Sequence, residues 1–179
     1  MEPRTKEVRQ LPNRLRLHNI MARRGQIRPR KTEFDPIYGG ILITKLINRS
    51  MRDGKRSVAQ KEVYRAFELI REKSQEDPVK IFDKAIENIK PTMEVRPRRV
   101  GGAAYQVPQV VRGSRKEALA IRWLVASANA KSNSEFHTYA EKLADEIINA
   151  SKGEGGAVKK RQEVERTAEA NKAFSHFRW

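Results

Sequence analysis

The sequence contains no cysteine among its 179 residues, and aromatic side chains make up only 7% of it. The absence of cysteine excludes a disulfide framework and any zinc site built on thiolates. Hydrophobic residues account for 38% of the chain, below the roughly 45–50% that is usual for globular domains. No apolar run approaches the roughly 20 residues of a membrane span, and the first thirty residues lack the apolar core of a secretory signal. We therefore expect a cytosolic protein without a membrane segment.

Signatures of catalysis are also missing. The three histidines, His18, His137 and His176, lie far apart and show no metal-ligand spacing. The segment 53–57 is similar to the end of a phosphate-binding loop, but that motif needs glycine at position 49, where the chain has arginine. No nucleophile-elbow motif is present. The sequence therefore predicts a protein that is not an enzyme and has no metal site and no cofactor.

Positive charge is abundant and concentrated. Lys and Arg number 38 against 22 Asp and Glu, a formal net charge of +16. Residues 1–31 carry a net +8 and residues 90–116 a net +6, whereas the remainder is nearly neutral. Charge concentrated in this way attracts a polyanion and gains affinity by releasing its counterions.

The first 34 residues and the rest of the chain differ in pattern. Residues 1–34 lack hydrophobic periodicity and contain three prolines among arginines, which predicts a basic, disordered N-terminal arm. Residues 35–179 predict a single helical domain of six helices. We expect the first helix to run to Asp53-Gly54, the third to begin at Asp77-Pro78, and the last to span 157–174. Capping boxes at 57–60 and 114–117 predict the starts of the second and fourth helices, and Ser132 or Ser134 that of the fifth.

Residues 92–112 break the helical pattern. They are rich in valine and are interrupted by Gly101-Gly102, which predicts two antiparallel strands joined near these glycines. Pro97 and Pro108 cannot donate to a strand ladder, so both strands should be edges. The predicted fold is therefore mainly α, a six-helix body with a projecting two-stranded β-ribbon inserted at about 92–112.

Basic side chains on the ribbon and on the first helix are the candidate binding residues. Arg96, Arg98 and Arg99 lead into the glycines, where arginine forks can grip phosphate and bare backbone lets a strand approach closely. Tyr105 either stacks on an unpaired base or packs across the ribbon. The C-terminal aromatics 174, 177 and 179 either anchor the last helix to the core or contact a partner, and we expect the anchor.

Two further basic groups adjoin helices. Arg112, Arg115 and Lys116 lie where the second strand meets the fourth helix, so the positive end of the helix dipole adds to their attraction for phosphate. Along the first helix, residues 45, 49 and 52 have the i, i+4, i+7 spacing of a basic ridge.

Four segments together resemble the small-subunit ribosomal protein seven family, bacterial type. They are 53–57 (DGKRS), 93–108 (MEVRPRRVGGAAYQVP), 118–124 (ALAIRWL) and 157–179, with AVKKR, AEANKAF and RW. The likeness covers about residues 21–179 in order. Met21–Gly25 is similar to the usual start of the family, which makes residues 1–20 an extension without family support.

The resemblance implies a primary binder of the 3′ major domain of 16S ribosomal RNA that helps nucleate assembly of the subunit head. It places the ribbon near the messenger exit and the exit-site transfer RNA, beside neighbouring small-subunit proteins, in a cytoplasmic or organellar ribosome. The implied ribosomal-RNA residues are Arg23, Arg24, Arg28, Arg30, Lys31, Lys45, Arg49, Arg52, Lys55, Arg56, Arg112, Arg115 and Lys116. The implied ribbon residues near messenger and transfer RNA are Arg96, Arg98, Arg99, Gly101, Gly102 and Tyr105.

A second function class fits the same residues. An architectural DNA-binding protein would also use a helical body and arginines on a two-stranded arm that enters a groove. Charge and periodicity alone do not distinguish a DNA-binding protein from a ribosomal one, since both functions need a basic ribbon.

Overall fold

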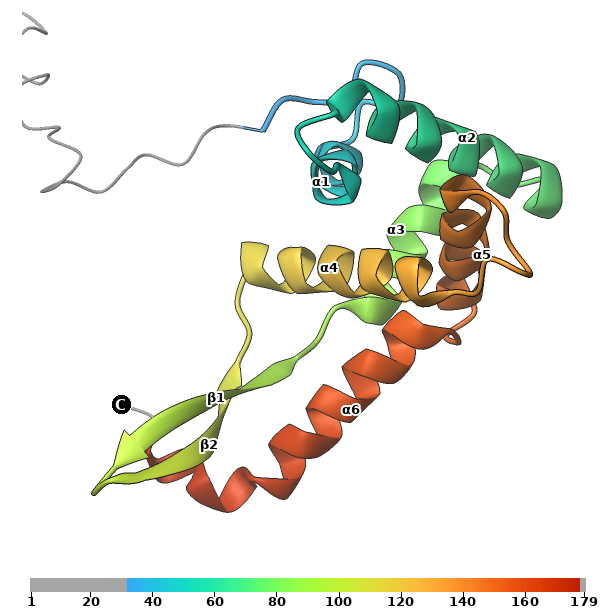
Figure 1. Ribbon diagram of the computed structural model, residues 1–179. Helices are drawn as coiled ribbons and strands as arrows, with labels where there is room; N and C mark the ends of the chain where they lie inside the picture. Colours follow the sequence, from blue (N-terminus) through green and yellow to red (C-terminus); the bar gives the residue numbers. More distant parts are fainter. Residues whose placement is uncertain (1–31, 178–179) are drawn as a thin grey trace, which may run out of the picture. The chain divides into compact units, whose positions relative to one another are not determined.

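The computed structural model describes residues 32–177, and of these residues 33–177 belong to one compact unit. Within that unit, three helices are followed by a two-stranded ribbon and three more helices (Figure 1). The elements are α1 (Ile41–Ser50), α2 (Arg56–Ser74), α3 (Pro78–Ile89), β1 (Met93–Val100), β2 (Ala103–Val110), α4 (Ser114–Ala130), α5 (Tyr139–Ser151) and α6 (Gly156–Ala170). A short 3-10 helix, η2 (Lys172–Phe177), follows α6. The predicted fold class is confirmed.

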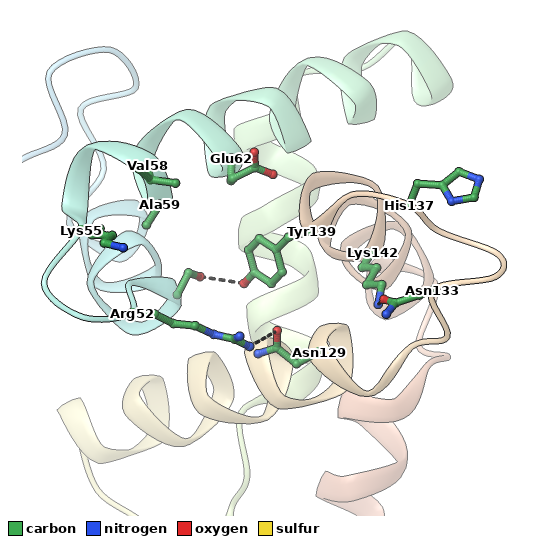
Figure 2. A pocket seen from close by; sticks show the side chains of 11 residues that line it. Arg52, Lys55, Val58, Ala59, Glu62, Asn129, Asn133, His137, Tyr139 and Lys142 are labelled. Atoms are coloured by element: carbon green, nitrogen blue, oxygen red, sulfur yellow. Dashed lines mark hydrogen bonds between the residues drawn. The ribbon is translucent and has the colours of Figure 1, made fainter.

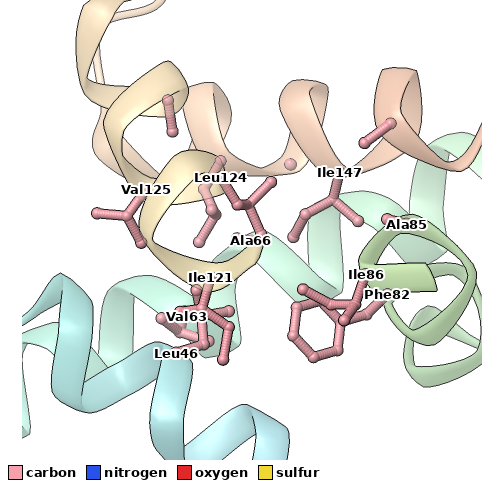
Figure 3. Close-up of a cluster of buried hydrophobic side chains, with 14 of the residues drawn as sticks. Leu46, Val63, Ala66, Phe82, Ala85, Ile86, Ile121, Leu124, Val125 and Ile147 are labelled. Atoms are coloured by element: carbon pink, nitrogen blue, oxygen red, sulfur yellow. The ribbon is translucent and has the colours of Figure 1, made fainter. Parts of the chain in front are cut away.

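One hydrophobic core joins the helices. Its largest members are Phe67 of α2 and Phe82 of α3, whose ring centroids lie 5.6 Å apart and whose side chains are fully buried. Side chains from α1, α4, α5 and the start of α6 complete the cluster, and Leu124 and Ile147 are among them (Figure 3). Each large side chain contributes about 1.5–3 kcal/mol when it is removed from water. The core therefore fixes α1–α5 as the rigid body from which the ribbon extends.

The start of α3 follows the sequence prediction, whereas those of α2 and α4 do not. Asp77 accepts a hydrogen bond from the Val79 backbone nitrogen at 3.0 Å, with Pro78 at the first helical position. The expected capping boxes of α2 and α4 are absent: these helices begin after Lys55 and Gly113, and neither has a side-chain cap. In α4 the sequence pattern was misleading because Glu117, the expected capping partner, binds Lys45 of α1 instead.

The cap of α5 lies further along the chain than expected. Thr138 accepts a hydrogen bond from the Glu141 backbone nitrogen, and the Glu141 carboxylate accepts one from the Thr138 nitrogen. Ser132 and Ser134 instead hydrogen-bond to each other. A run of small hydroxyl residues offered several capping registers, and the one with glutamate at the third position formed.

Two predicted helix ends were too late. Helix α1 ends at Ser50, and Asp53 and Gly54, with φ of 51° and 73°, form a separate turn after it. Arg52 therefore lies beyond the helix and does not continue its basic face. Helix α6 ends at Ala170, after which the chain tightens into η2.

The ribbon extends away from α1–α5, and α6 runs beside it (Figure 1). Its strands pair in antiparallel register from Met93 opposite Val110 to Val100 opposite Ala103, with Gly101 and Gly102 in the turn. The Thr92 backbone nitrogen and hydroxyl both donate to Glu165 of α6, at 2.9 and 2.7 Å. Helix α6 thus supports the base of the ribbon as well as packing against the body.

Candidate nucleic-acid interface

A groove of about 560 Å³ lies where the ribbon joins α4. Side chains of both strands and of the first turn of α4 line it: Glu94, Arg96, Arg98, Gln109, Val110, Val111, Arg112 and Arg115. The structure therefore brings four of the predicted arginines to one surface, although they come from two segments of the sequence, 96–98 and 112–115. Among the described residues that line the groove, four carry guanidinium groups and one carries a carboxylate, so their formal charges sum to a positive value.

Glu94 organises two of these arginines. Arg115 donates from Nε and Nη2 to the two carboxylate oxygens of Glu94, at distances between 2.7 and 2.9 Å. The Arg96 Nε donates to the Glu94 Oε1 at 2.7 Å. The glutamate side chain is 10% exposed, whereas both arginine side chains are 47% exposed. One buried carboxylate thus holds two partly exposed guanidinium groups.

Electrostatics keep Glu94 ionised. Burial alone would raise its pKa, but hydrogen bonds from Arg115 and then Arg96 outweigh burial and hold the pKa below its ordinary value. The same hydrogen bond raises the pKa of Arg115. Sequence reasoning did not single out Glu94. The available signal was that Glu94 is the one acid in the basic segment 90–116.

The tip of the ribbon is open. Gly101 and Gly102 have φ of 58° and 90°, and a Cβ added at either position would meet no atom within 4 Å. Arg99 beside them is exposed, and Arg98 is half-buried. A left-handed turn of bare glycine backbone leaves room for a nucleic-acid strand to approach closely.

Tyr105 faces the C-terminal segment. Its ring centroid lies 5.3 Å from that of Phe174 and 5.2 Å from that of Phe177 in η2. The two phenylalanines therefore anchor the chain end to the ribbon and not to the helical core, so the expected core anchor is wrong. The remaining aromatic residue of that prediction, Trp179, lies outside the described residues.

The predicted ridge on α1 is divided. Lys45 forms an ion pair with Glu117 of α4, with 2.6 Å between Nζ and Oε2. Arg49 is exposed, and both residues line a shallow surface with Arg122, which sequence reasoning missed. Arg52 donates to the Asn129 side chain at 3.2 Å. The ridge therefore joins α1 to α4 as well as presenting positive charge.

A second hollow of about 480 Å³ lies between the turn after α1 and the start of α5 (Figure 2). Arg52 and Lys55 line one side of it and Lys142 the other, with Tyr139 between them. The Tyr139 hydroxyl and the Ser50 hydroxyl lie 2.8 Å apart, and burial raises the pKa of Tyr139. Arg56 is exposed at the start of α2 outside this hollow.

Lys116 is half-buried in the first turn of α4, next to the groove but not lining it. The arm residues Arg23, Arg24, Arg28, Arg30 and Lys31 lie outside the described residues. Within residues 32–177, no group of three or more acidic or histidine side chains could hold a metal ion. No helix in that range is long and apolar enough to span a membrane.

Comparison with known proteins accounts for this arrangement. The family model of ribosomal protein S7p/S5e matches residues 22–172. The chain belongs to this family. It is 54% identical to the small ribosomal subunit protein uS7 of Carboxydothermus hydrogenoformans over 89% of its own length and 100% of that protein. It is 52% identical to the uS7 of Thermotoga maritima over 88% of its length and 99% of that protein.

Membership of the S7 family confirms the expected class of protein. The chain is a structural, non-enzymatic protein of the small ribosomal subunit, with ribosomal RNA and neighbouring ribosomal proteins as its partners. Its location is that of the subunit, in the cytoplasm. Neither the family nor these relatives support the DNA-binding alternative.

Proposed function

We propose that this S7-family chain is a primary binder of the 3′ major domain of 16S ribosomal RNA and that it helps nucleate assembly of the subunit head. A primary binder must recognise RNA without help from other proteins, so its own surface must supply the positive charge. The groove between the ribbon and α4 carries this proposal, since Arg96, Arg98, Arg112 and Arg115 line it together.

The remaining basic residues extend this surface. Lys45 and Arg49 lie on α1, Arg52 and Lys55 lie between α1 and α2, and Arg56 begins α2. Lys116 adds charge at the first turn of α4, where the helix dipole also favours an anion. The arm, residues 1–34, contributes Arg23, Arg24, Arg28, Arg30 and Lys31. Such contacts are mainly with phosphates, which position a protein on RNA and make affinity depend on salt.

In this proposal the ribbon tip contacts ribosomal RNA and also lies close to a second set of RNA partners. Arg98, Arg99 and the open glycine turn lie at the end of the ribbon furthest from the helical body. We propose that this end lies near the messenger exit and the exit-site transfer RNA. Tyr105 supports the tip through its contacts with Phe174 and Phe177. Its ring is half-buried by these contacts, which favours a packing role over base stacking.

A competition experiment tests this function. The full chain is bound to a labelled transcript of the 3′ major domain, without other ribosomal proteins, and is challenged with unlabelled transcript, duplex DNA or unstructured single strands. We expect the folded transcript to compete at least 100-fold better than either alternative, because shape and phosphate geometry add to general charge attraction. Preference for duplex DNA, or no binding without other proteins, would contradict the proposal.

A further inference from the structure

Glu94 is an unexpected residue for an RNA-binding surface. It is the one acid between residues 90 and 116, and it lies at the base of a groove that otherwise carries arginines. An exposed carboxylate there would repel phosphate and weaken binding. Glu94 is instead buried, with 7% of the residue exposed, and its charge is directed into hydrogen bonds with protein groups.

The single negative charge of Glu94 pairs with two positively charged guanidinium groups. A buried carboxylate requires a partner, and the three hydrogen bonds from Arg115 satisfy both of its oxygens. Arg96 adds a second guanidinium at the same Oε1 atom, 2.7 Å from its Nε. The cluster therefore keeps a net positive charge after the ion pairs are formed.

The hydrogen bonds leave donors available on both arginines. Arg96 uses only Nε and Arg115 uses Nε and Nη2, so both Nη groups of Arg96 and Nη1 of Arg115 have no hydrogen-bond partner among residues 32–177. Their side chains are each 47% exposed and line the groove. Phosphate oxygens accept from such paired guanidinium groups in short, charge-assisted hydrogen bonds.

Close approach of the two guanidinium groups depends on Glu94. Both Nε atoms lie within 2.8 Å of one carboxylate oxygen. Two like charges this near would repel each other without the intervening anion, and each long side chain would return to many solvated conformations. The arginine side chains thus lose their conformational entropy when the protein folds, before RNA binds.

We propose that Glu94 is a positioning residue: its buried carboxylate holds Arg96 and Arg115 together as one site for RNA phosphates and so strengthens RNA binding despite its negative charge. This inference rests on the proposed function, because it names the arrangement by which that surface grips RNA. The competing explanation is that Glu94 only joins the ribbon to α4 as a structural ion pair.

Replacement Glu94→Gln tests the inference by the direction in which RNA affinity changes. Removing a negative charge from an RNA surface raises affinity by general electrostatics, whereas loss of a positioning carboxylate lowers it. We expect the full chain with Glu94→Gln to bind the 3′ major domain transcript about tenfold more weakly at 0.15 M salt. The plot of log affinity against log salt should become shallower by about one, because one phosphate contact is lost.

Three controls accompany this variant. Glu72→Gln removes the same charge from an exposed position on α2, at the opposite end of the unit from the ribbon, and should leave affinity unchanged or slightly higher (Figure 1). Glu94→Asp keeps the anion and should recover part of the affinity. Arg115→Lys keeps the charge but loses the two-pronged contact, so it should weaken binding as Glu94→Gln does.

The outcomes separate this inference from the proposed function. Tighter or unchanged binding by Glu94→Gln, with the wild-type chain binding normally, overturns the inference alone. Weaker binding with an unchanged salt slope, measured well below the melting temperature, assigns Glu94 a purely structural role and also overturns it. Failure of the wild-type chain to bind the transcript refutes the proposed function itself.

Discussion

Tyr105 of the ribbon packs against Phe174 of the C-terminal 3-10 helix, with ring centroids 5.3 Å apart and ring planes at 52°. The two residues are separated by α4, α5 and α6 in sequence, yet their contact joins the end of the chain to β2. Helix α6 supports the base of the ribbon through Glu165, and this aromatic contact supports it nearer the tip. The ribbon is thus held at two points along its length.

Phe174→Ala should loosen the tip without unfolding the body. An aromatic pair contributes about 0.5–1.5 kcal/mol beyond the area it buries, so the melting temperature of the helical core should change little. Amide hydrogen exchange at residues 103–107 should become about tenfold faster. Phe34→Ala is the matched control, because Phe34 is 68% exposed and makes no ring contact within the described residues. Equal exchange in both variants would show that Phe174 does not hold the ribbon.

Acid should weaken the junction of ribbon and body. The pKa of Glu94 is lower in the folded chain than its ordinary value of 4.5, so its stabilisation is complete above pH 4.5 and is lost as pH falls through the lowered pKa. Arg96 and Arg115 face the carboxylate, and Glu163 of α6 lines a pocket with it. Glu165 has a lowered pKa for a similar reason, since Thr92 hydrogen bonds outweigh its burial.

Denaturant unfolding at several pH values measures this effect. At pH 7 we expect Glu94→Gln to lower the free energy of unfolding by about 2 kcal/mol, the order found for hydrogen bonds to charged groups. The difference from wild type should shrink as pH falls below 4.5 and through the lowered pKa of Glu94. A difference that stayed constant with pH would show that ionisation of Glu94 does not contribute to stability.

How much of this architecture the sequence predicts depends on the range of the interactions. The six helices and the break between the two strands at Gly101-Gly102 follow from local sequence patterns and were predicted. The starts of α2, α4 and α5 were not: α2 and α4 begin without a side-chain cap, and several serines and a threonine precede α5, of which Thr138 forms the cap. Glu117 illustrates this, since its partner Lys45 lies 72 residues away.

The candidate interface shows the same limit. Charge concentration identified Arg96, Arg98, Arg112 and Arg115 as candidates, but their meeting in one groove depends on how β1, β2 and α4 join. The pairing of Glu94 with Arg115 spans 21 residues and has no sequence periodicity. The sequence left open whether Tyr105 stacks on a base or packs across the ribbon, because its aromatic partners lie at the far end of the chain.

Glu146 should be important for stability, although it is charged. Its residue is 1% exposed, it accepts a hydrogen bond from the Ala157 backbone nitrogen at 2.9 Å, and Lys131 lies 3.0 Å from its other oxygen. It thereby satisfies a donor in the first turn of α6 from the neighbouring helix. We expect Glu146→Ala to lower the free energy of unfolding by about 3–5 kcal/mol in chemical denaturation.

Glu154→Ala is the control for Glu146→Ala, because Glu154 is exposed in the loop before α6 and should change stability by less than about 0.5 kcal/mol. Similar losses in both variants would mean that the loop, and not the buried carboxylate, determines the stability of the α6 start.

Glu117→Gln should raise RNA affinity, in contrast to Glu94→Gln. Glu117 pairs with a single lysine, Lys45, and both side chains are 32% exposed, so the pair contributes at most about 1 kcal/mol to stability. Removing the carboxylate frees Lys45 for phosphate and deletes a repulsive charge from the interface. We expect binding to the transcript to become about threefold tighter at 0.15 M salt. Weaker binding would place Lys45 among residues that must be held by Glu117.

The arginines at the ribbon tip should contribute to binding through phosphate contacts. Replacing Arg98 and Arg99 together by Ala should make the plot of log affinity against log salt shallower by about two, if each contacts one phosphate. Stability should change little, because Arg99 is exposed and Arg98 is only half-buried. The exposed pair Arg65 and Arg71 of α2, replaced by Ala, controls for loss of two positive charges far from the ribbon. A slope that matches wild type would show that the tip does not contact phosphate in the transcript, and the arginines would then have to act on another RNA.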